Sequence, residues 1–209
     1  MATNAEVVAH IQLLGDLALQ ECNRRARDGL GLVIPSICIA QSAHETGWGT
    51  APIMTRANAF FGIKAGGSWT GKVYVADTWE VAPNGEAYNT VANFRAYDSL
   101  EESVADYYNL IVNNSRYAGG VSYYPDLKSA EETIQAIWSG GYATDTVYPE
   151  LIMNMIRGRN LTQWDSKINP ANASGDSTGT TPGGGGHTYV PNTPSSDPGE
   201  YVRYIFEKI

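Results

Sequence analysis

The chain has 209 residues, of which 43% are hydrophobic and 17% are charged, a composition typical of a globular protein with room for one full domain and a tail. The formal net charge of −8 at pH 7 argues against nucleic acid as a partner, because a phosphate-binding surface needs clustered Lys and Arg. No segment reaches the ~18 consecutive apolar residues of a membrane span. The histidines His10, His44 and His187 are too few and too scattered for a metal site, so we expect neither a metal nor a cofactor.

The first expected element is an amphipathic helix. Thr3 and Glu6 have the spacing of a capping box, and apolar residues then recur every three or four positions as far as Cys22. The helix is expected to end near residues 27–29. Cys22 and Cys38 both fall inside predicted helices, and we interpret them as small buried side chains. A disulfide between them stays open, since the sequence does not supply their Cα separation.

A second helix is expected to begin at Pro35 and to be buried, because residues 36–41 are apolar nearly all round. Glu45 stands at its end, and Gly47 stops it. A Glu after a helix is usually a solvated surface residue. A carboxylate on a buried helix instead loses hydration, which favours the protonated form that a general acid needs. Trp48 follows between two glycines, which allow a tight turn with an indole wall on which a sugar ring stacks.

The pattern then changes to the two-residue period of strands. Residues 72–75 and 78–81 form one run and residues 88–97 a second. Pro83-Asn84-Gly85 between them carries the Asn-Gly signal of a hairpin turn. We therefore predict a small β-hairpin.

Three more helices are expected after the hairpin. Ser99 and Ser129 each stand three residues before a Glu, the spacing of a helix cap, and Gly140 closes the second of these helices. The last helix is expected from about Thr146 to Ile156.

The chain divides into three parts by composition. The main domain is expected over residues 1–165. Residues 166–198 are rich in Gly, Ser and Pro and cannot bury enough apolar area to order themselves, so they form a linker. Helical periodicity returns in residues 199–209, and because a linker leads to another unit, we expect the start of a further helical module or a docking segment there.

Four blocks of the sequence resemble, in the same order, the N-acetylglucosaminidase family of peptidoglycan hydrolases, the flagellar-muramidase-like glucosaminidases. This similarity covers about residues 7–161. There is one extra residue between Asn58 and Phe61 relative to the family's pattern, and the family's proline after the last block is Thr146 here. The blocks are SAHETGWG at 42–49, NAFFGIK at 58–64, FRAYDS at 94–99 and GYATD at 141–145.

The resemblance implies a mainly α (α+β), lysozyme-like fold with a small β-hairpin lobe and a substrate groove. It also implies cleavage of the β-1,4 bond between N-acetylglucosamine and N-acetylmuramic acid in bacterial peptidoglycan glycan strands. Glu45 would be the general acid, Tyr142 would lie near it, and a second carboxylate would stand in the β-element, where we place it at Glu80. The residues expected to contact the substrate are Trp48, Asn58, Phe61, Gly62, Lys64, Thr144 and Asp145.

Alternatives remain for several of these assignments. Asp77 and Glu86 compete with Glu80, which could also be a solvent-facing strand residue, and the acetamido group of the substrate could replace a second carboxylate. Tyr142 could be a buried tyrosine with a satisfied hydroxyl. We interpret the block at 94–99 as structural, with Arg95 paired to a carboxylate.

The function also has alternatives: a lytic transglycosylase or muramidase on the same fold, or a non-catalytic virion or wall-binding module. The N-terminus lacks the charged stretch and apolar run of a secretion signal. For an enzyme that acts outside the cell on the wall, this favours a phage origin, with release through a holin or on the virion. A second wall-lytic or wall-binding module is expected after the linker.

Overall fold

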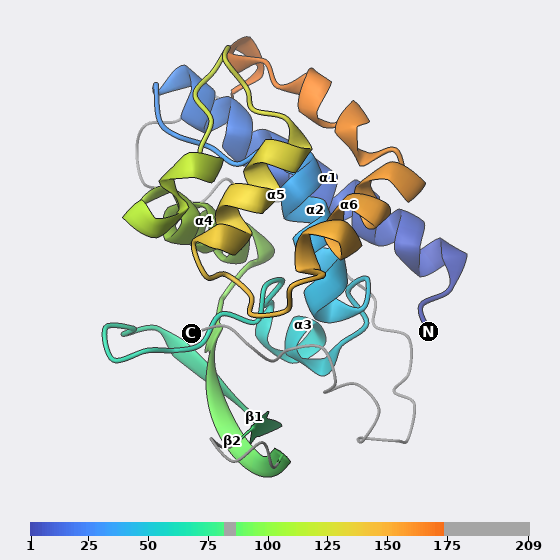
Figure 1. Ribbon diagram of the computed structural model, residues 1–209, viewed down its shortest axis with the longest axis vertical. Helices are drawn as coiled ribbons and strands as arrows, with labels where there is room; N and C mark the ends of the chain where they lie inside the picture. The colour runs from blue at the N-terminus through green and yellow to red at the C-terminus, as the bar shows by residue number, and fades with distance from the viewer. Residues whose placement is uncertain (82–86, 174–209) are drawn as a thin grey trace.

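The computed structural model describes residues 1–81 and 87–173, and of residues 78–81 and 87–89 it describes the backbone alone. The described chain is mainly helical with one two-stranded sheet (Figure 1), which confirms the predicted mainly α (α+β) fold class with a small β-hairpin lobe. In chain order the elements are α1 (Asn4–Arg27), α2 (Pro35–Thr46), α3 (Pro52–Ala57), β1 (Lys72–Val81), β2 (Ala87–Ala96), α4 (Leu100–Val112), η1 (Ser115–Gly120), α5 (Ala130–Ser139), α6 (Tyr148–Gly158), η2 (Leu161–Gln163), η3 (Asp165–Lys167) and η4 (Pro170–Asn172).

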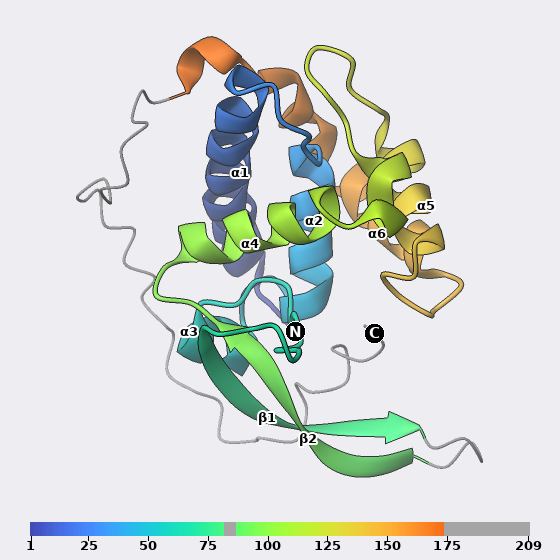
Figure 2. The same cartoon turned by 90° about the vertical axis from the view of Figure 1, so that its left-hand side faces the viewer.

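Helix α2 is the centre of the helical body, and α1 and α6 pack against it (Figures 1 and 2). Pro35 lies in its first turn, and Gly47 ends it in the left-handed conformation with φ 56°. Every residue of α2 except His44 is buried. The prediction of a buried second helix is therefore confirmed.

Side chains cap the helices where the sequence predicts them to begin. The Thr3 hydroxyl accepts a hydrogen bond from the Glu6 amide at 3.3 Å, and the Glu6 carboxylate accepts from the Thr3 amide at 2.7 Å. Ser129 and Glu132 form the same reciprocal box at α5. Ser99 caps α4 with its hydroxyl. These contacts satisfy amides that lack a partner within their own helix, and they confirm three predicted helix starts.

The predicted hairpin is also confirmed. Strands β1 and β2 pair antiparallel, with Lys72 opposite Ala96, and the lobe projects from the side of the helical body where α2 ends and α3 lies (Figure 2). Phe94 is buried in a second, smaller core beneath the sheet. Residues 63–65 pair with the free edge of β2 through two backbone hydrogen bonds of 2.8 Å. The turn predicted at residues 83–85 lies outside the described residues.

The C-terminal part of the fold differs from the sequence expectation. Helix α6 begins at Tyr148, two residues after the predicted Thr146, because the Asp145 carboxylate accepts from the Val147 amide at 3.0 Å and holds that turn outside the helix. The chain then returns along α2 and α1 in three short 3₁₀ turns. Ile168, between η3 and η4, is buried.

The Asp165 carboxylate accepts from the amide and hydroxyl of Ser36 at 2.8 and 2.7 Å and so caps the first turn of α2. The packed fold therefore extends past residue 165, the predicted end of the main domain, and covers the first residues of the predicted linker. The linker's remainder and the predicted final segment, residues 174–209, lie outside the described residues.

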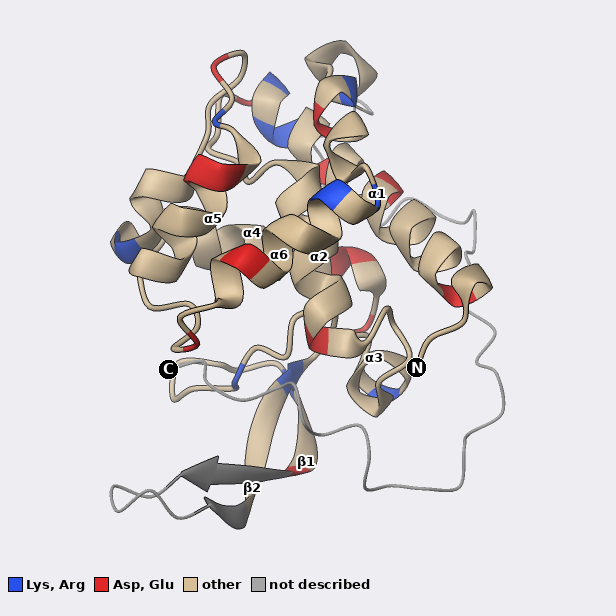
Figure 3. Cartoon of the chain, turned by 45° about the vertical axis from the view of Figure 1, so that its right-hand side comes forward, with Lys and Arg blue, Asp and Glu red and all other residues tan. Residues whose placement is uncertain are grey.

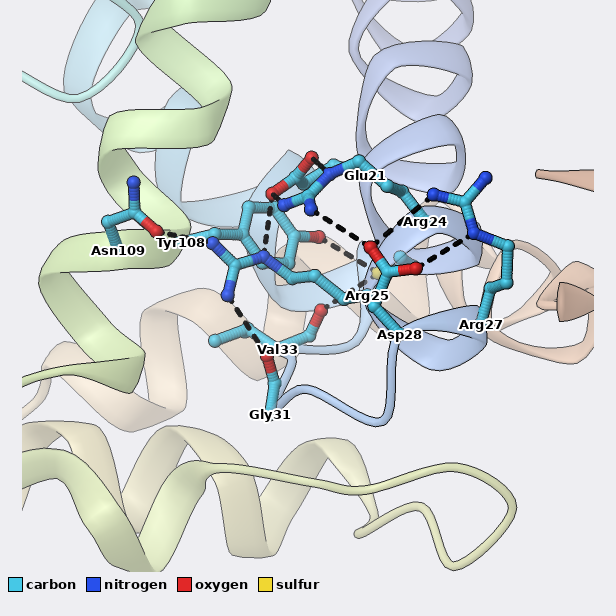
Figure 4. A network of polar contacts seen from close by, with 10 residues as sticks. Glu21, Arg24, Arg25, Arg27, Asp28, Gly31, Val33, Tyr108 and Asn109 are labelled. Carbon is cyan, nitrogen blue, oxygen red and sulfur yellow. Dashed lines mark hydrogen bonds and ion pairs between the residues drawn. The ribbon is translucent and has the colours of Figure 1, made fainter. Parts of the chain in front are cut away.

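A buried arginine fixes the end of α1 against α4 (Figure 4). The guanidinium of Arg25 donates to the Glu21 carboxylate at 2.6 Å, to the Gly31 carbonyl at 3.1 Å and to the Asn109 side chain at 2.6 Å. It also lies 5.4 Å from the ring centroid of Tyr108. Each nitrogen of this buried charge thus has a partner, which is the condition for a buried charge to be tolerated.

The two cysteines are free and buried, so the disulfide that the sequence left open is absent. The sulfur of Cys22 lies 3.2 Å from the Val33 carbonyl and from the Tyr108 hydroxyl, and burial raises the pKa of this thiol to about 12. In the part of the chain that the structure describes, no helix combines the length and apolar character needed to cross a membrane. Lys and Arg lie scattered among Asp and Glu on the face in Figure 3.

Candidate active site

Glu45 lies in the last turn of α2 and is only 5% exposed. Three tyrosines from three different segments are its electrostatic neighbours: Tyr107 of α4, Tyr142 of the loop after α5, and Tyr148 of α6. Burial raises the pKa of the Tyr148 hydroxyl well above its usual range, and the negative charge of Glu45 raises it further. Burial does the same to Tyr142, with Tyr148 and Glu45 adding to the effect. Both hydroxyls therefore stay protonated at neutral pH and are potential donors beside the carboxyl group.

The turn after Glu45 has an unusual backbone. Gly47, Trp48 and Gly49 all have positive φ angles, of 56°, 63° and 81°, and such angles are strained for a tryptophan. The Thr46 hydroxyl holds the turn, since it donates to the Ser42 carbonyl at 2.7 Å and accepts from the Gly49 amide at 2.8 Å.

Trp48, predicted to be a sugar platform, is half-buried against protein groups. Its ring lies edge-on to His10 with a centroid separation of 6.0 Å, and the Arg159 guanidinium lies 5.7 Å from its centroid. Burial lowers the pKa of His10 to about 4, so this neighbour is neutral at physiological pH. The contacts of Trp48 anchor the turn that follows Glu45, and a role in sugar stacking stays a prediction.

The second block has a mainly structural placement. Phe61 is 1% exposed and stacks on Tyr107 with a centroid separation of 4.0 Å. It therefore packs in the core against one of the tyrosines of the site. Asn58 ends α3 with φ 50° and donates its amide to the Tyr97 carbonyl at 3.1 Å. Gly62 is buried with φ 53°, whereas Lys64 is exposed on the segment paired with β2. Of these four residues Lys64 is the exposed one, and its contact with a substrate stays a prediction.

The block at 141–145 brings Tyr142 to Glu45 and leaves its other end exposed. Thr144 is exposed. The Asp145 carbonyl accepts from the Trp138 indole at 2.9 Å, and its carboxylate accepts from the Val147 amide. Asp145 therefore shapes the loop between α5 and α6. Both residues are exposed, and their contact with a substrate stays a prediction.

The structure gives only the backbone position of Glu80. It pairs with Tyr88 in the hairpin, and its side chain is not among those described. Its competitor Asp77 is exposed and pairs with Val91, and Glu86 lies outside the described residues. The predicted structural role of Arg95 is confirmed, because its guanidinium binds both oxygens of Asp106 at 2.9 Å.

Sequence reasoning missed three residues that the fold brings to this site. Gln41 lies one turn before Glu45 on α2 and is fully buried, Tyr107 donates to its carbonyl oxygen, and its amide donates to the Tyr148 hydroxyl at 2.8 Å. An amide side chain in a helix expected to be buried was the available signal, because a buried amide requires partners. The partners stand 66 and 107 residues away in the sequence, so periodicity could not identify them.

In residues 1–81 and 87–173, no group of three or more His, Cys, Asp and Glu side chains could hold a metal. A pocket of about 620 Å³ includes Asp165 and Arg157 in its lining. Because Asp165 caps Ser36, this pocket lies at the opposite end of α2 from Glu45, a separation of about 14 Å along the helix.

Comparison with known proteins agrees with this geometry. Residues 24–161, about two thirds of the chain, match the glucosaminidase family model, described as mannosyl-glycoprotein endo-beta-N-acetylglucosaminidase. The chain is 40% identical over 126 residues to the peptidoglycan hydrolase FlgJ of Escherichia coli, a match that covers 58% of this chain and 38% of that protein. It is 33% identical over 146 residues to the exo-glucosaminidase LytG of Bacillus subtilis, covering 69% of this chain and 50% of LytG. The chain thus spans half or less of these two relatives.

Solved structures show the same arrangement of elements. The catalytic domain of the autolysin Auto from Listeria monocytogenes superposes with a TM-score of 0.65 at 29% identity, covering 79% of this chain and 90% of that domain. A peptidoglycan hydrolase from Sphingomonas sp. A1, solved as a mutant, superposes with a TM-score of 0.56 at 37% identity, covering 73% and 97%. The predicted lysozyme-like glucosaminidase fold is confirmed, and the chain belongs to the glucosaminidase family of glycoside hydrolases.

Proposed function

We propose that this chain is an endo-β-N-acetylglucosaminidase that cleaves the β-1,4 bond between N-acetylglucosamine and N-acetylmuramic acid in peptidoglycan, with Glu45 as general acid. The observation that carries the proposal is the placement of Glu45, which is 5% exposed at the end of the central helix, with Tyr142 and Tyr148 as electrostatic neighbours. Glycosidic hydrolysis requires an acid that protonates the leaving oxygen, and a carboxyl group removed from water is suited to that step.

The relatives support the substrate class. FlgJ is named a peptidoglycan hydrolase, which supports peptidoglycan as the substrate, and LytG is named an exo-glucosaminidase, which agrees with the family model on a glucosaminidase reaction. Endo cleavage is our proposal for this chain. Release of single sugars from chain ends would be the exo alternative, and the length distribution of the products decides between them.

The test of the acid is Glu45→Gln. An amide has the same volume but cannot donate the proton, so we expect wall-lytic activity to fall on the order of 100-fold or more with an unchanged melting temperature. Glu101→Gln, the same substitution on the exposed first turn of α4, is the matched control and should keep full activity. If Glu45→Gln kept more than about a tenth of wild-type activity, Glu45 would not be the acid.

We also propose Glu80 as the second carboxylate, supported by its place in β1 of the hairpin lobe. Glu80→Gln should lower turnover roughly 10-fold or more with little change in substrate binding, because the interaction is realised in the transition state. Asp77→Asn and Glu86→Gln should be much milder. If all three variants stay within about twofold of wild type, a route assisted by the substrate's acetamido group or a transglycosylase route through Glu45 alone is the better account.

A further module after the linker is a finer proposal that rests on the sequence. We propose a second wall-lytic or wall-binding module after the linker, supported by the Gly- and Pro-rich composition that follows the packed fold and by the return of apolar periodicity after residue 199. Action at the cell wall follows from the proposed substrate, and the phage origin stays a prediction.

A further inference from the structure

The side-chain amide of Gln41 joins two tyrosines across the centre of the site. Gln41 is 0% exposed, and a buried amide needs partners for both its oxygen and its nitrogen. Its oxygen accepts from the Tyr107 hydroxyl of α4, and its nitrogen donates to the Tyr148 hydroxyl of α6 at 2.8 Å. Hydrogen bonds thus connect α4, α2 and α6 one turn before Glu45.

The two hydrogen bonds run in one direction, from Tyr107 to Gln41 and from Gln41 to Tyr148. The Tyr107 hydroxyl donates its only hydrogen to Gln41, which leaves the amide hydrogens of Gln41 to point at Tyr148. The oxygen of Tyr148 is therefore an acceptor toward Gln41, and its own hydrogen must point elsewhere.

The ring of Tyr148 packs against two other rings. His44 lies edge-on to it at a centroid separation of 5.4 Å, and Tyr142 lies at 6.0 Å. Because the ring is 2% exposed and packed, the torsion of the O–H bond is its main remaining freedom. Glu45 stands four residues after Gln41 on α2 and therefore on the same face of the helix, next to the hydroxyl that Gln41 holds. An O–H donor turns toward a carboxyl oxygen that can accept its hydrogen.

We propose that Gln41, fixed by Tyr107, is a positioning residue that turns the hydroxyl hydrogen of Tyr148 toward the carboxyl group of Glu45. The inference deepens the proposed function and rests on Glu45 being the acid. A donor facing one carboxyl oxygen favours placement of the acidic proton on the other oxygen, the one that must meet the leaving group. The same donor stabilises the carboxylate that remains after proton transfer.

The test compares single-hydroxyl deletions in tyrosines of equal burial. Tyr148→Phe removes the donor and should lower kcat/KM about 10-fold on soluble glycan fragments. Tyr107→Phe leaves the Gln41 amide free to turn and should lower it about threefold. Tyr108→Phe is the matched control: its hydroxyl meets Cys22 instead of Gln41, and it should stay within about twofold of wild type.

Two readouts separate positioning from a general loss of packing. First, loss of the donor removes an interaction that favours the ionised acid, so the alkaline limb of the kcat/KM profile should move to higher pH by about half a unit or more in Tyr148→Phe. Tyr107, Tyr142 and Tyr148 are titratable groups that interact electrostatically with Glu45, and burial raises the pKa of each well above its usual range, so their own titration lies far from neutral pH. His44→Gln serves as a check that the moving limb does not belong to the neighbouring imidazole.

Second, Tyr107 is proposed to act through Tyr148, so adding Tyr107→Phe to Tyr148→Phe should cause no further loss of kcat/KM. Multiplicative losses in the double variant, or an unmoved alkaline limb in Tyr148→Phe, would overturn the inference. If the inference is overturned in this way while Glu45→Gln is inactive in the same assay, the proposed function still stands. If Glu45→Gln is active, the acid assignment and this inference are both wrong.

Discussion

The turn after Glu45 predicts a large and specific effect of one added methyl group. Gly49 has φ +81°, and a Cβ built there would lie 2.8 Å from His10 Nδ1. Gly29 also has a positive φ, of +66°, but its Cβ would meet nothing within 4 Å. Gly29→Ala is therefore the matched control: both substitutions strain the backbone, and only the added methyl group at position 49 meets a neighbouring side chain.

The magnitudes follow from these two terms. Left-handed backbone costs an alanine roughly 1–2 kcal/mol, and the loss of a flexible glycine from the unfolded chain returns about 0.4–1 kcal/mol. Gly29→Ala should thus lower the free energy of unfolding by about 1 kcal/mol. Gly49→Ala adds the cost of overpacking against His10, about 1–3 kcal/mol, for a total of roughly 2–4 kcal/mol.

Urea unfolding at neutral pH measures both values. The double variant Gly49→Ala with His10→Ala isolates the contact, because removing the ring should relieve the excess cost of the alanine and give a favourable coupling of about 1–2 kcal/mol. Equal destabilisation by Gly49→Ala and Gly29→Ala, with no coupling to His10, would refute the reasoning that the His10 ring leaves no room for a side chain at position 49.

The remaining predictions concern the ends of the fold. Burial raises the pKa of Asp165 from 3.8 to about 6, so the folded state binds the carboxyl proton more tightly than the unfolded state does. The resulting stabilisation of the fold is complete below about pH 4 and is lost as the pH rises through about 6. Relative to Asp165→Asn, the wild-type free energy of unfolding should fall by roughly 1–3 kcal/mol over this interval, and a difference that rises with pH would contradict the assignment. Deletion of residues 174–209 should leave the melting temperature nearly unchanged, because a Gly-rich linker adds no core; a drop of more than about 5 °C would show that the deleted part packs on the domain.

Local signals predicted the elements well where one short pattern decides the structure. The caps at Thr3, Ser99 and Ser129 and the Pro35 and Gly47 boundaries of α2 needed no information from distant parts of the chain. The start of α6 was missed because Asp145, three residues before Tyr148, bonds the intervening turn. The 3₁₀ turns after α6 were missed because three-residue helices are too short to show periodicity.

The burial of Glu45 at the end of α2 was predictable, but its surroundings were not. Its position could be predicted because burial and a glycine stop can both be read from neighbouring residues, and its role as the acid stays a prediction. The contacts of Trp48 with His10 and Arg159 depend on tertiary packing, which the local sequence does not give, and its expected contact with a sugar stays a prediction. The bond from Gln41 to Tyr148 depends on tertiary packing alone, so only the fold reveals it.

Analysis of the reducing ends of digested peptidoglycan tests the central claim most directly. Purified wall is digested with the wild-type chain and, in parallel, with Glu45→Gln; the products are reduced with borohydride and identified by mass spectrometry. Cleavage after N-acetylglucosamine predicts N-acetylglucosaminitol ends that are absent from the Glu45→Gln digest. N-acetylmuramicitol ends would indicate a muramidase and anhydro-muramic ends a lytic transglycosylase, and either result would contradict the proposed glucosaminidase reaction.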